Sequence, residues 1–306
     1  MASQRVPTGV LPVLQTPFDS KGDIDTQTLR REVDWAFESG AHGLTVAMVS
    51  EILRMDHAER RALTEQVCSA ASGRGPVIVS VGAESTKAAV ELARHAEAAG
   101  AACLMAIPPL SVQLGPDELA GYFVAIAEAT ALPLVVQDAS SYVGSVLPIE
   151  LLARLHSYDT QRICFKPEAQ PLGPRLSALL DATGGEAKVY DGSGGVALID
   201  TFRRGIVGTM PSTDLCWAIA RLWSYLQAGD YDAAYRLSQP VAALLAMQTS
   251  LDAYVAIEKY LLVQQKVFVS SACRDPSGFQ LDRLTALQVD AHFALLTSAF
   301  EASPDI

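Results

Sequence analysis

Short apolar runs alternate with longer segments of helical period along the first three quarters of the chain. The apolar runs occupy residues 10–14, 43–48, 77–81, 102–107, 132–137, 163–166, 187–191 and 205–210. Most of them are continuous Val, Ile and Leu runs, as expected for strands that are buried on both faces. Helical spacing follows them at 26–39, 56–72, from Ser85, from Pro116, from about 148, at 172–182, at 194–203 and from about 213. The pattern therefore predicts eight strand–helix units.

These eight units fill about 228 residues, which is the length of a (β/α)8 TIM barrel. An open, doubly wound sheet is the alternative, although eight near-equal units are unusual for it. Beyond residue 228 the chain reads as helices only, with apolar residues at three-to-four spacing in 231–248, 252–268 and 283–301. We therefore expect an α/β fold with a barrel in residues 1–228. Residues 229–306 are expected to form a C-terminal helical region that packs on the barrel or builds an oligomer contact.

Charge and composition argue against several classes of partner. The 306 residues carry a net charge of −11, and no run of basic residues is present, so no nucleic-acid partner is expected. There is no stretch of 18 apolar residues, and therefore no membrane span or membrane partner is expected. The first ten residues lack the apolar core of a signal peptide. The five cysteines are scattered without a C-x-x-C pair, which favours a cytoplasmic protein with reduced thiols.

The motif content favours neither a metal nor a bound cofactor. No two of the five histidines are spaced as ligands on one helix face, and no H-E-x-x-H sequence occurs. The glycine-rich stretch at 192–195 follows neither the G-x-G-x-x-G nor the Walker A pattern. We therefore expect no metal site and no cofactor.

Lys166 is the strongest candidate for chemistry because it ends the apolar run at 163–166. Active sites of such barrels lie at the carboxyl ends of the strands. The other five lysines lie in a turn, in helices or at the start of a strand. Partial burial there favours the neutral amine, and a neutral amine attacks a carbonyl carbon to form a Schiff base. The alternative is that Lys166 only forms an ion pair, with Glu168 or another acid at the rim.

Several short motifs resemble those of the dihydrodipicolinate synthase and N-acetylneuraminate lyase superfamily. They are TPF at 16–18, the turn at 46–51, FKPE at 165–168, and the glycine turns at 190–195 and 205–212. Within that superfamily, VQDA at 136–139, SE at 50–51 and FKPE at 165–168 are similar to the 2-keto-3-deoxy-L-arabonate dehydratases. The resemblance implies a (β/α)8 barrel with a helical C-terminal region, often assembled as a homotetramer. It also implies a Schiff base between Lys166 and a small-molecule 2-oxo acid.

The resemblance also implies roles for individual residues. Gln137 replaces the tyrosine that relays protons in most of the superfamily, and Glu168 carries protons in its place. Met48 and Val49 stand where the superfamily has two threonines, so the substrate carboxylate would bind backbone N–H groups around Val49 and Ser50. Tyr142 matches the arginine of the synthase substrate loop. The expected catalytic residues are Lys166 and Glu168, and the expected substrate contacts are Val49, Ser50, Gln137, Asp138, Gly192 and Thr209.

The expected reaction is dehydration of a 2-keto-3-deoxy sugar acid such as 2-keto-3-deoxy-L-arabonate, catalysed by a carbon–oxygen lyase. A pyruvate-dependent aldolase and a catalytically reduced 2-oxo acid binding protein are the alternatives. Dehydration needs an acid near the C4 oxygen, whereas aldol cleavage needs a base there. Glu168 suits either role if burial raises its pKa.

Overall fold

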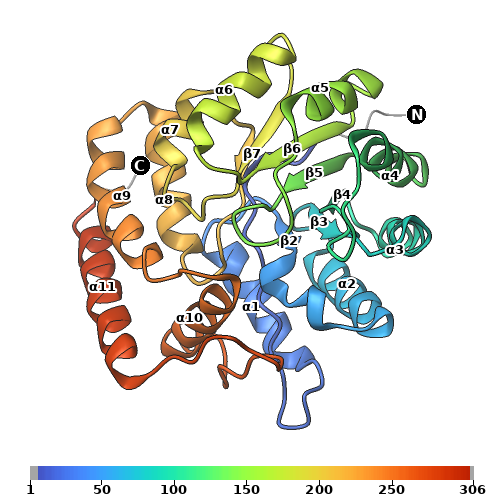
Figure 1. The fold of residues 1–306 in the computed structure, drawn as a ribbon. Coiled ribbons are helices and arrows are strands. Elements are labelled where there is room, and N and C mark those ends of the chain that lie inside the picture. Colours follow the sequence, from blue (N-terminus) through green and yellow to red (C-terminus); the bar gives the residue numbers. More distant parts are fainter. Residues whose placement is uncertain (1–5, 304–306) are drawn as a thin grey trace.

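The computed structural model describes residues 6–303. Its strands are β1 (Gly9–Val10), β2 (Leu44–Val46), β3 (Val77–Ser80), β4 (Cys103–Ala106), β5 (Leu134–Asp138), β6 (Ile163–Pro167), β7 (Lys188–Asp191) and β8 (Gly208–Thr209). The helices that follow them are α1 (Thr26–Glu38), α2 (His57–Ala71), α3 (Thr86–Ala98), α4 (Pro116–Glu128), α5 (Ile149–Tyr158), α6 (Leu172–Ala182), α7 (Leu198–Arg203) and α8 (Cys216–Ala228). Two short 3-10 turns, η1 (Met48–Ser50) and η2 (Ile52–Arg54), follow β2. Figure 1 shows the strands in the centre, with these helices around them.

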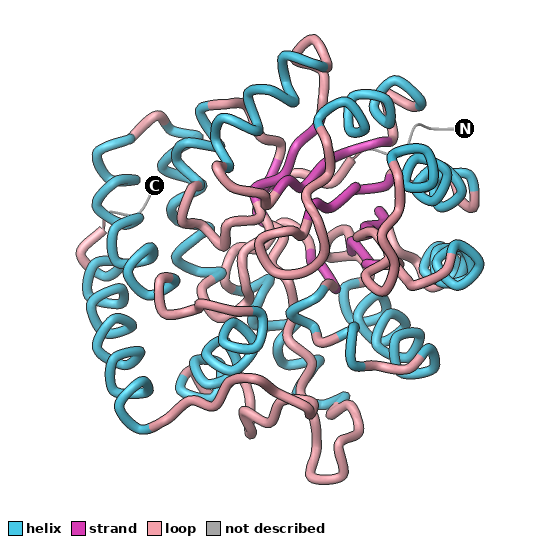
Figure 2. The backbone as a smooth tube through the Cα atoms, viewed as in Figure 1, coloured by secondary structure: helices cyan, strands magenta, loops and turns pink. Residues whose placement is uncertain are grey.

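The eight strands form one parallel sheet in the order β1-β8-β7-β6-β5-β4-β3-β2. The sheet curls until its two ends meet beside Val13. This residue makes parallel bridges both to Thr45 of β2 and to Ser212, which follows β8, and Leu14 N–H donates to the Thr45 carbonyl at 2.9 Å. Figure 2 shows the strands enclosed by helices. The prediction of an α/β fold of the TIM-barrel type is confirmed at this level.

Side chains alternate between the inside of the curled sheet and the helical layer. Val135 and Cys164 belong to an apolar cluster inside the sheet, while Leu134, Ile163 and Phe165 pack with the helices. Because strand side chains have a period of two, the residues two places after Val135 and Cys164 also point inside. This alternation directs Gln137 and Lys166 into the mouth of the barrel.

Two predicted helix starts coincide with residues that favour the beginning of a helix. Ser85 is the N-cap of α3 and its side chain accepts from Ala88 N–H, and Pro116 is the first residue of α4. The predicted run at 10–14 is shorter in the structure, since β1 ends at Val10 and proline at position 12 has no N–H to donate. Helix α7 was predicted over residues 194–203 but begins only at Leu198, so the predicted helix was too long at its start.

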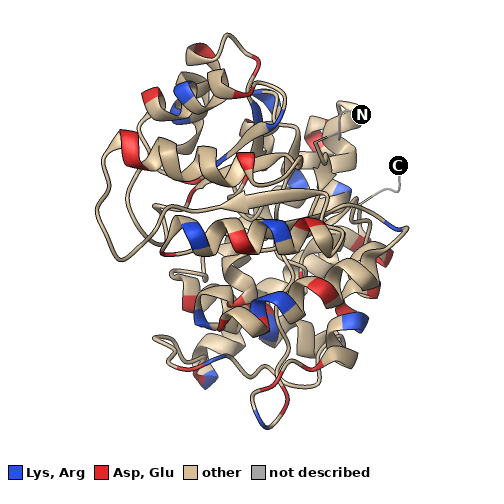
Figure 3. Cartoon of the chain, turned by 90° about the vertical axis from the view of Figure 1, so that its right-hand side faces the viewer, with Lys and Arg blue, Asp and Glu red and all other residues tan. Residues whose placement is uncertain are grey.

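Three further helices complete the described chain: α9 (Tyr231–Leu245), α10 (Leu251–Gln264) and α11 (Arg283–Glu301). Helix α9 packs between α8 and α11, and α10 lies against the η1 turn at the strand ends. The face in Figure 3 carries acidic and basic segments interspersed along its helices. Within residues 6–303, no helix has the length and apolar character required to cross a membrane. No group of metal-ligating side chains was found in that same range.

Candidate active site

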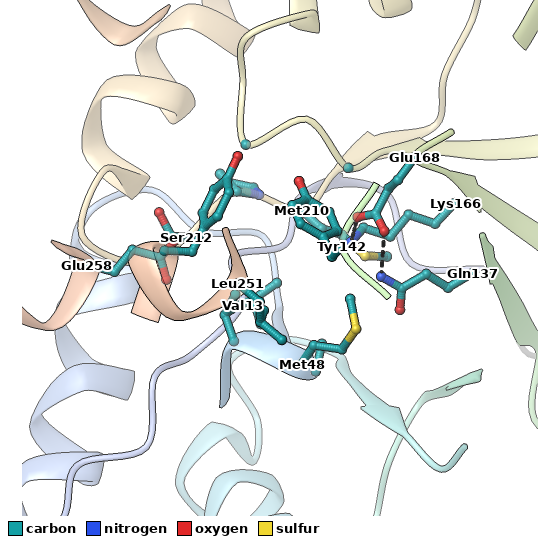
Figure 4. Close-up of a pocket in the computed structure, with 16 residues that line it drawn as sticks. Val13, Met48, Gln137, Tyr142, Lys166, Glu168, Met210, Ser212, Leu251 and Glu258 are labelled. Carbon is teal, nitrogen blue, oxygen red and sulfur yellow. Dashed lines mark hydrogen bonds and ion pairs between the residues drawn. The ribbon is translucent and has the colours of Figure 1, made fainter. Parts of the chain in front are cut away.

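A cavity opens at the carboxyl ends of the strands and contains Lys166 (Figure 4). It encloses about 460 Å³ of space not filled by atoms, part of it open to solvent. Its walls come from the ends of β5 and β6, the η1 turn, the segments after β7 and β8, and one face of α10. The lining residues are Val13, Ala47, Met48, Val49, Gln137, Tyr142, Lys166, Glu168, Gly192, Gly194, Met210, Pro211, Ser212, Leu251, Tyr254 and Glu258.

Lys166, Glu168 and Gln137 form a connected group at one end of this cavity. Lys166 Nζ lies 2.6 Å from Glu168 Oε1, and Gln137 Nε2 donates to Glu168 Oε2 at 2.9 Å. All three side chains are buried, and Gln137 pairs with Lys166 across β5 and β6. The ion pair that the sequence left as an alternative is therefore present, but it lies within a cavity rather than at a solvated rim.

Burial raises the pKa of Glu168, while the Lys166 charge and the hydrogen bonds from Lys166 and Gln137 lower it in part. The backbone fixes the carboxylate, since Glu168 N–H donates to the Asp138 carbonyl at 3.0 Å and Ser141 Oγ donates to the Glu168 carbonyl. The amide oxygen of Gln137 is buried and has no hydrogen-bond partner among the described residues. The Glu168 carboxyl group, whose pKa is raised, thus lies beside the Lys166 amine. The unpaired amide oxygen of Gln137 belongs to the same buried group.

Gly192 makes room for this pair. A Cβ atom at this position would lie 2.6 Å from Glu168 Oε1 and 2.9 Å from Lys166 Cε, well inside van der Waals contact. The predicted role of Gly192 as a substrate contact fits its place in the cavity wall, and the structure adds that a side chain there would displace both charged groups.

The η1 turn presents backbone donors to the cavity. Met48 and Val49 line the cavity, and their N–H groups begin the 3-10 turn, where no carbonyl of the turn can accept them. Ser50 does not line the cavity. Its N–H donates to the Ala47 carbonyl, and its hydroxyl accepts from Ala47 N–H at 3.1 Å and donates to the Leu14 carbonyl. Met48 and Val49, rather than Ser50, therefore have backbone N–H groups at the cavity wall, and Ser50 holds the turn.

Two other predicted contacts also lie outside the cavity wall. The Asp138 carboxylate accepts from the N–H groups of Ser140 and Leu147, at 3.2 and 3.1 Å, and so fixes the loop that carries Tyr142. Thr209 Oγ1 donates to Asp191 Oδ2 at 3.1 Å. Both side chains are buried and paired within the protein, and neither lines the cavity.

Sequence reasoning missed the wall that α10 contributes. Leu251, Tyr254 and Glu258 line the cavity, and the Tyr254 ring meets Tyr142 edge to face at 5.5 Å between centroids. The signal was available, because positions i, i+3 and i+7 lie on one helix face. What the sequence does not reveal is that this face turns toward the strand ends.

Lys259 lies in the middle of α10, and a lysine side chain is almost never fully buried unless it is paired. Its side chain is fully buried, and its ammonium group pairs with Glu51 and donates to the Ala272 carbonyl at 2.8 Å. Glu51 follows the η1 turn in a left-handed conformation, with φ of 61°, and also accepts from Arg274 N–H at 2.6 Å. This ion pair fastens α10 to the turn that carries Met48 and Val49.

Comparison with known proteins supports the relationship that the motifs indicated. The chain is 28% identical over 274 residues to the L-2-keto-3-deoxyarabonate dehydratase of Azospirillum brasilense, with 88% of each chain covered. It is 26% identical over 277 residues to a probable 2-dehydro-3-deoxy-D-pentonate aldolase of Escherichia coli (strain K12), covering 88% of this chain and 91% of that one.

Solved structures show the same fold. The dihydrodipicolinate synthase of Rhodopseudomonas palustris superposes with a TM-score of 0.86 at 26% identity, covering 96% of this chain and all of that one. The sequence model of the dihydrodipicolinate synthetase family matches residues 6–290. With that match across nearly its whole length, the chain belongs to the dihydrodipicolinate synthetase family.

Proposed function

We propose that this protein dehydrates a 2-keto-3-deoxy sugar acid, such as 2-keto-3-deoxy-L-arabonate, through a Schiff base on Lys166. The observation that carries the proposal is the buried amine of Lys166, 2.6 Å from Glu168 Oε1 in a cavity. Proton transfer from the ammonium group to Glu168 gives the neutral amine that the attack requires. The substrate carboxylate is held by the N–H groups of Met48 and Val49.

The proposed reaction then proceeds on the substrate chain. Condensation with the 2-oxo carbon releases water and leaves an iminium ion at C2. Loss of a proton from C3 gives an enamine, which expels the C4 hydroxyl as water when Glu168 supplies a proton. Proton shifts from C5 to C3 and from the C5 hydroxyl group to C4 then convert the allylic alcohol to an aldehyde, and hydrolysis frees Lys166 and 2,5-dioxopentanoate.

Borohydride reduction tests the Schiff base directly. The protein is incubated with pyruvate or with 2-keto-3-deoxy-L-arabonate, reduced and digested, and the peptide containing FKPEAQPLGPR is weighed. We expect the mass of the reduced ligand on Lys166, and no addition in Lys166→Met. If no 2-oxo acid labels the wild-type protein, the Schiff-base proposal is refuted.

An aldolase is the second candidate, favoured by the similarity to a probable pentonate aldolase over 88% of the chain. The same iminium ion would then undergo cleavage of the C3–C4 bond, with loss of the C4 hydroxyl proton to a base. Product analysis separates the two reactions. Dehydration of 2-keto-3-deoxy-L-arabonate releases 2,5-dioxopentanoate, whereas aldol cleavage releases pyruvate and glycolaldehyde.

A further inference from the structure

The cavity has a second functional end, formed by Glu258 and Ser212. Figure 4 shows these two side chains on the side of the cavity away from Lys166, Glu168 and Gln137. Both belong to its lining. This end of the cavity is available to the remaining carbons of a substrate joined to Lys166 at its 2-oxo carbon.

Glu258 is buried, and other acids lie behind it. Its Oε2 accepts from Gln15 Nε2 at 2.7 Å, while Glu32 and Asp214 are buried nearby and raise its pKa further beyond the effect of burial. Ser212 lies beside Glu258 in the cavity lining and lowers the pKa of Asp214 and of Glu258 in part.

Nothing cationic balances these acids inside the cavity. Among residues 6–303, Lys166 is the one basic side chain in the lining, and the imine uses it. The neighbouring Lys259 is held by Glu51 and by the Ala272 carbonyl, away from the cavity.

A second carboxylate on the substrate would have no cation to pair with at this end. It would lose its hydration and face Glu258 and the buried acids beside it, and a carboxylate buried without a cation is strongly disfavoured. A hydroxyl group both donates and accepts hydrogen bonds, so it matches Glu258 whether that carboxyl group is protonated or ionised.

We propose that Glu258, with Ser212, is the specificity-determining end of the cavity: it binds a hydroxyl group on an uncharged substrate tail and rejects a second carboxylate. The substrates are thereby restricted to 2-oxo acids whose only carboxylate is C1. This inference rests on the proposed Schiff base at Lys166 and adds the chemical class of the tail.

Two probes that differ only at the tail test the proposal. They are 5-hydroxy-2-oxopentanoate and 2-oxoglutarate, which have the same chain length and end in a hydroxymethyl and a carboxylate group. Each is titrated in the borohydride reaction with wild-type protein, with tailless pyruvate as a reference. We expect half-maximal labelling by the hydroxy acid at a concentration roughly 100-fold lower than by 2-oxoglutarate.

Glu258→Gln replaces the acid with an amide of nearly the same shape, and the amide can donate hydrogen bonds to a carboxylate. We expect this variant to narrow the gap between the two tailed probes to below about 10-fold. Glu32→Gln is the matched control, since it removes a carboxyl group of the same buried cluster that does not line the cavity. The control is expected to keep the wild-type gap.

The outcomes separate this inference from the proposed function. Absence of labelling of the wild type by pyruvate and by every other 2-oxo acid tried refutes the Schiff base itself. Labelling by pyruvate with equal labelling by the two tailed probes in wild type refutes only the role of Glu258, and this arm decides the matter even if Glu258→Gln does not fold. An equal loss of discrimination in Glu32→Gln also overturns the proposal, because cluster charge rather than contact in the cavity would then set the preference.

Discussion

Glu168 is held between two donors, and each of its oxygens has a different partner. Lys166 Nζ donates to Oε1, and Gln137 Nε2 donates to Oε2. Gln137 cannot carry a proton, so it orients the carboxylate, and a proton leaving Lys166 goes to Oε1. In the proposed mechanism, Glu168 thus carries the proton that the sequence resemblance assigns to a tyrosine at the position of Gln137.

Glu168→Gln tests that division at a single residue. Because the amide keeps its hydrogen bonds but cannot transfer a proton, we expect borohydride trapping of pyruvate to persist after long incubation while kcat falls about 10²–10⁴-fold. The exposed Glu186→Gln serves as the control. Unchanged turnover in the Glu168 variant would remove the residue from the mechanism.

The wild-type pH profile follows from the same group. Burial raises the pKa of Glu168 above its ordinary value of 4.5, and only the ionised form accepts the Lys166 proton. We therefore expect kcat/KM to rise with pH through an apparent pKa above 4.5. The residual kcat/KM of the Glu168→Gln variant should not show this rise with pH.

Gly192→Ala tests the space beside the reacting pair. The added Cβ would meet Glu168 Oε1 at 2.6 Å and Lys166 Cε at 2.9 Å, so both groups must shift. A displacement of about 1 Å costs on the order of 10²-fold in rate, and we expect a loss of that size in kcat/KM. Gly121→Ala in α4 is the matched control, because its Cβ meets nothing within 4 Å. Equal activity of both variants would contradict the packing argument.

At the scale of elements, the strands near Lys166 could be predicted well. Continuous apolar runs located β5 and β6 to within two residues at each end, and the alternation after Cys164 and Val135 sets which side chains enter the cavity. Helix α6 begins and ends at the predicted residues 172 and 182. Local spacing is enough for these elements because each strand lies in the core and each helix covers it with one apolar face.

The contribution of α10 could not be predicted in the same way. Its cavity-lining residues carry helical spacing, but they meet the strand ends only because of packing between segments far apart in the sequence. The Lys259–Glu51 pair spans 208 positions, and no local pattern indicates such a contact. The division into a barrel at 1–228 and a helical region at 229–306 remains a prediction, which α10 complicates because it forms part of the cavity wall.

Lys259→Met tests how firmly α10 is attached. Removing one partner of a buried ion pair leaves the other charge unpaired, which costs about 3–5 kcal/mol. We expect that loss in the free energy of unfolding, measured by urea titration, together with weaker binding of 2-oxo acids through the η1 turn. Lys87→Met removes an exposed lysine from a surface pair at 3.5 Å and should cost less than about 1 kcal/mol. Similar losses of unfolding free energy in the two variants would show that the buried ion pair stabilises the protein no more than the exposed one.

For the whole molecule, the buried acids make stability depend on pH. Burial raises the pKa of Asp214 to about 7, while the unfolded chain titrates near 3.8. Between these values the folded state binds the extra proton, so the stabilisation is complete below 3.8 and is lost as pH rises through about 7. We expect the Tm of wild type to fall between pH 5.5 and pH 8, and Asp214→Asn to show a smaller fall. An equal or larger fall in the variant would contradict the assignment.

Assembly is the second property at this scale. Apolar side chains are exposed along α11 at Leu284, Leu287 and Leu295 and beside the strand ends at Val112 and Val146. Together with the family resemblance, this supports the expectation of a homotetramer. Light scattering at micromolar concentration should give about four times the chain mass of 32.6 kDa. A mass near one chain would contradict it.

The helix α10 has a consequence for how the protein is made. The ribosome releases Lys166 and Glu168 well before it reaches Leu251, Tyr254 and Glu258, which close one side of the cavity. Until α10 emerges and Lys259 reaches Glu51, a growing chain carries its reactive amine in an unfinished cavity. The last quarter of the chain is therefore needed to complete the wall of the cavity.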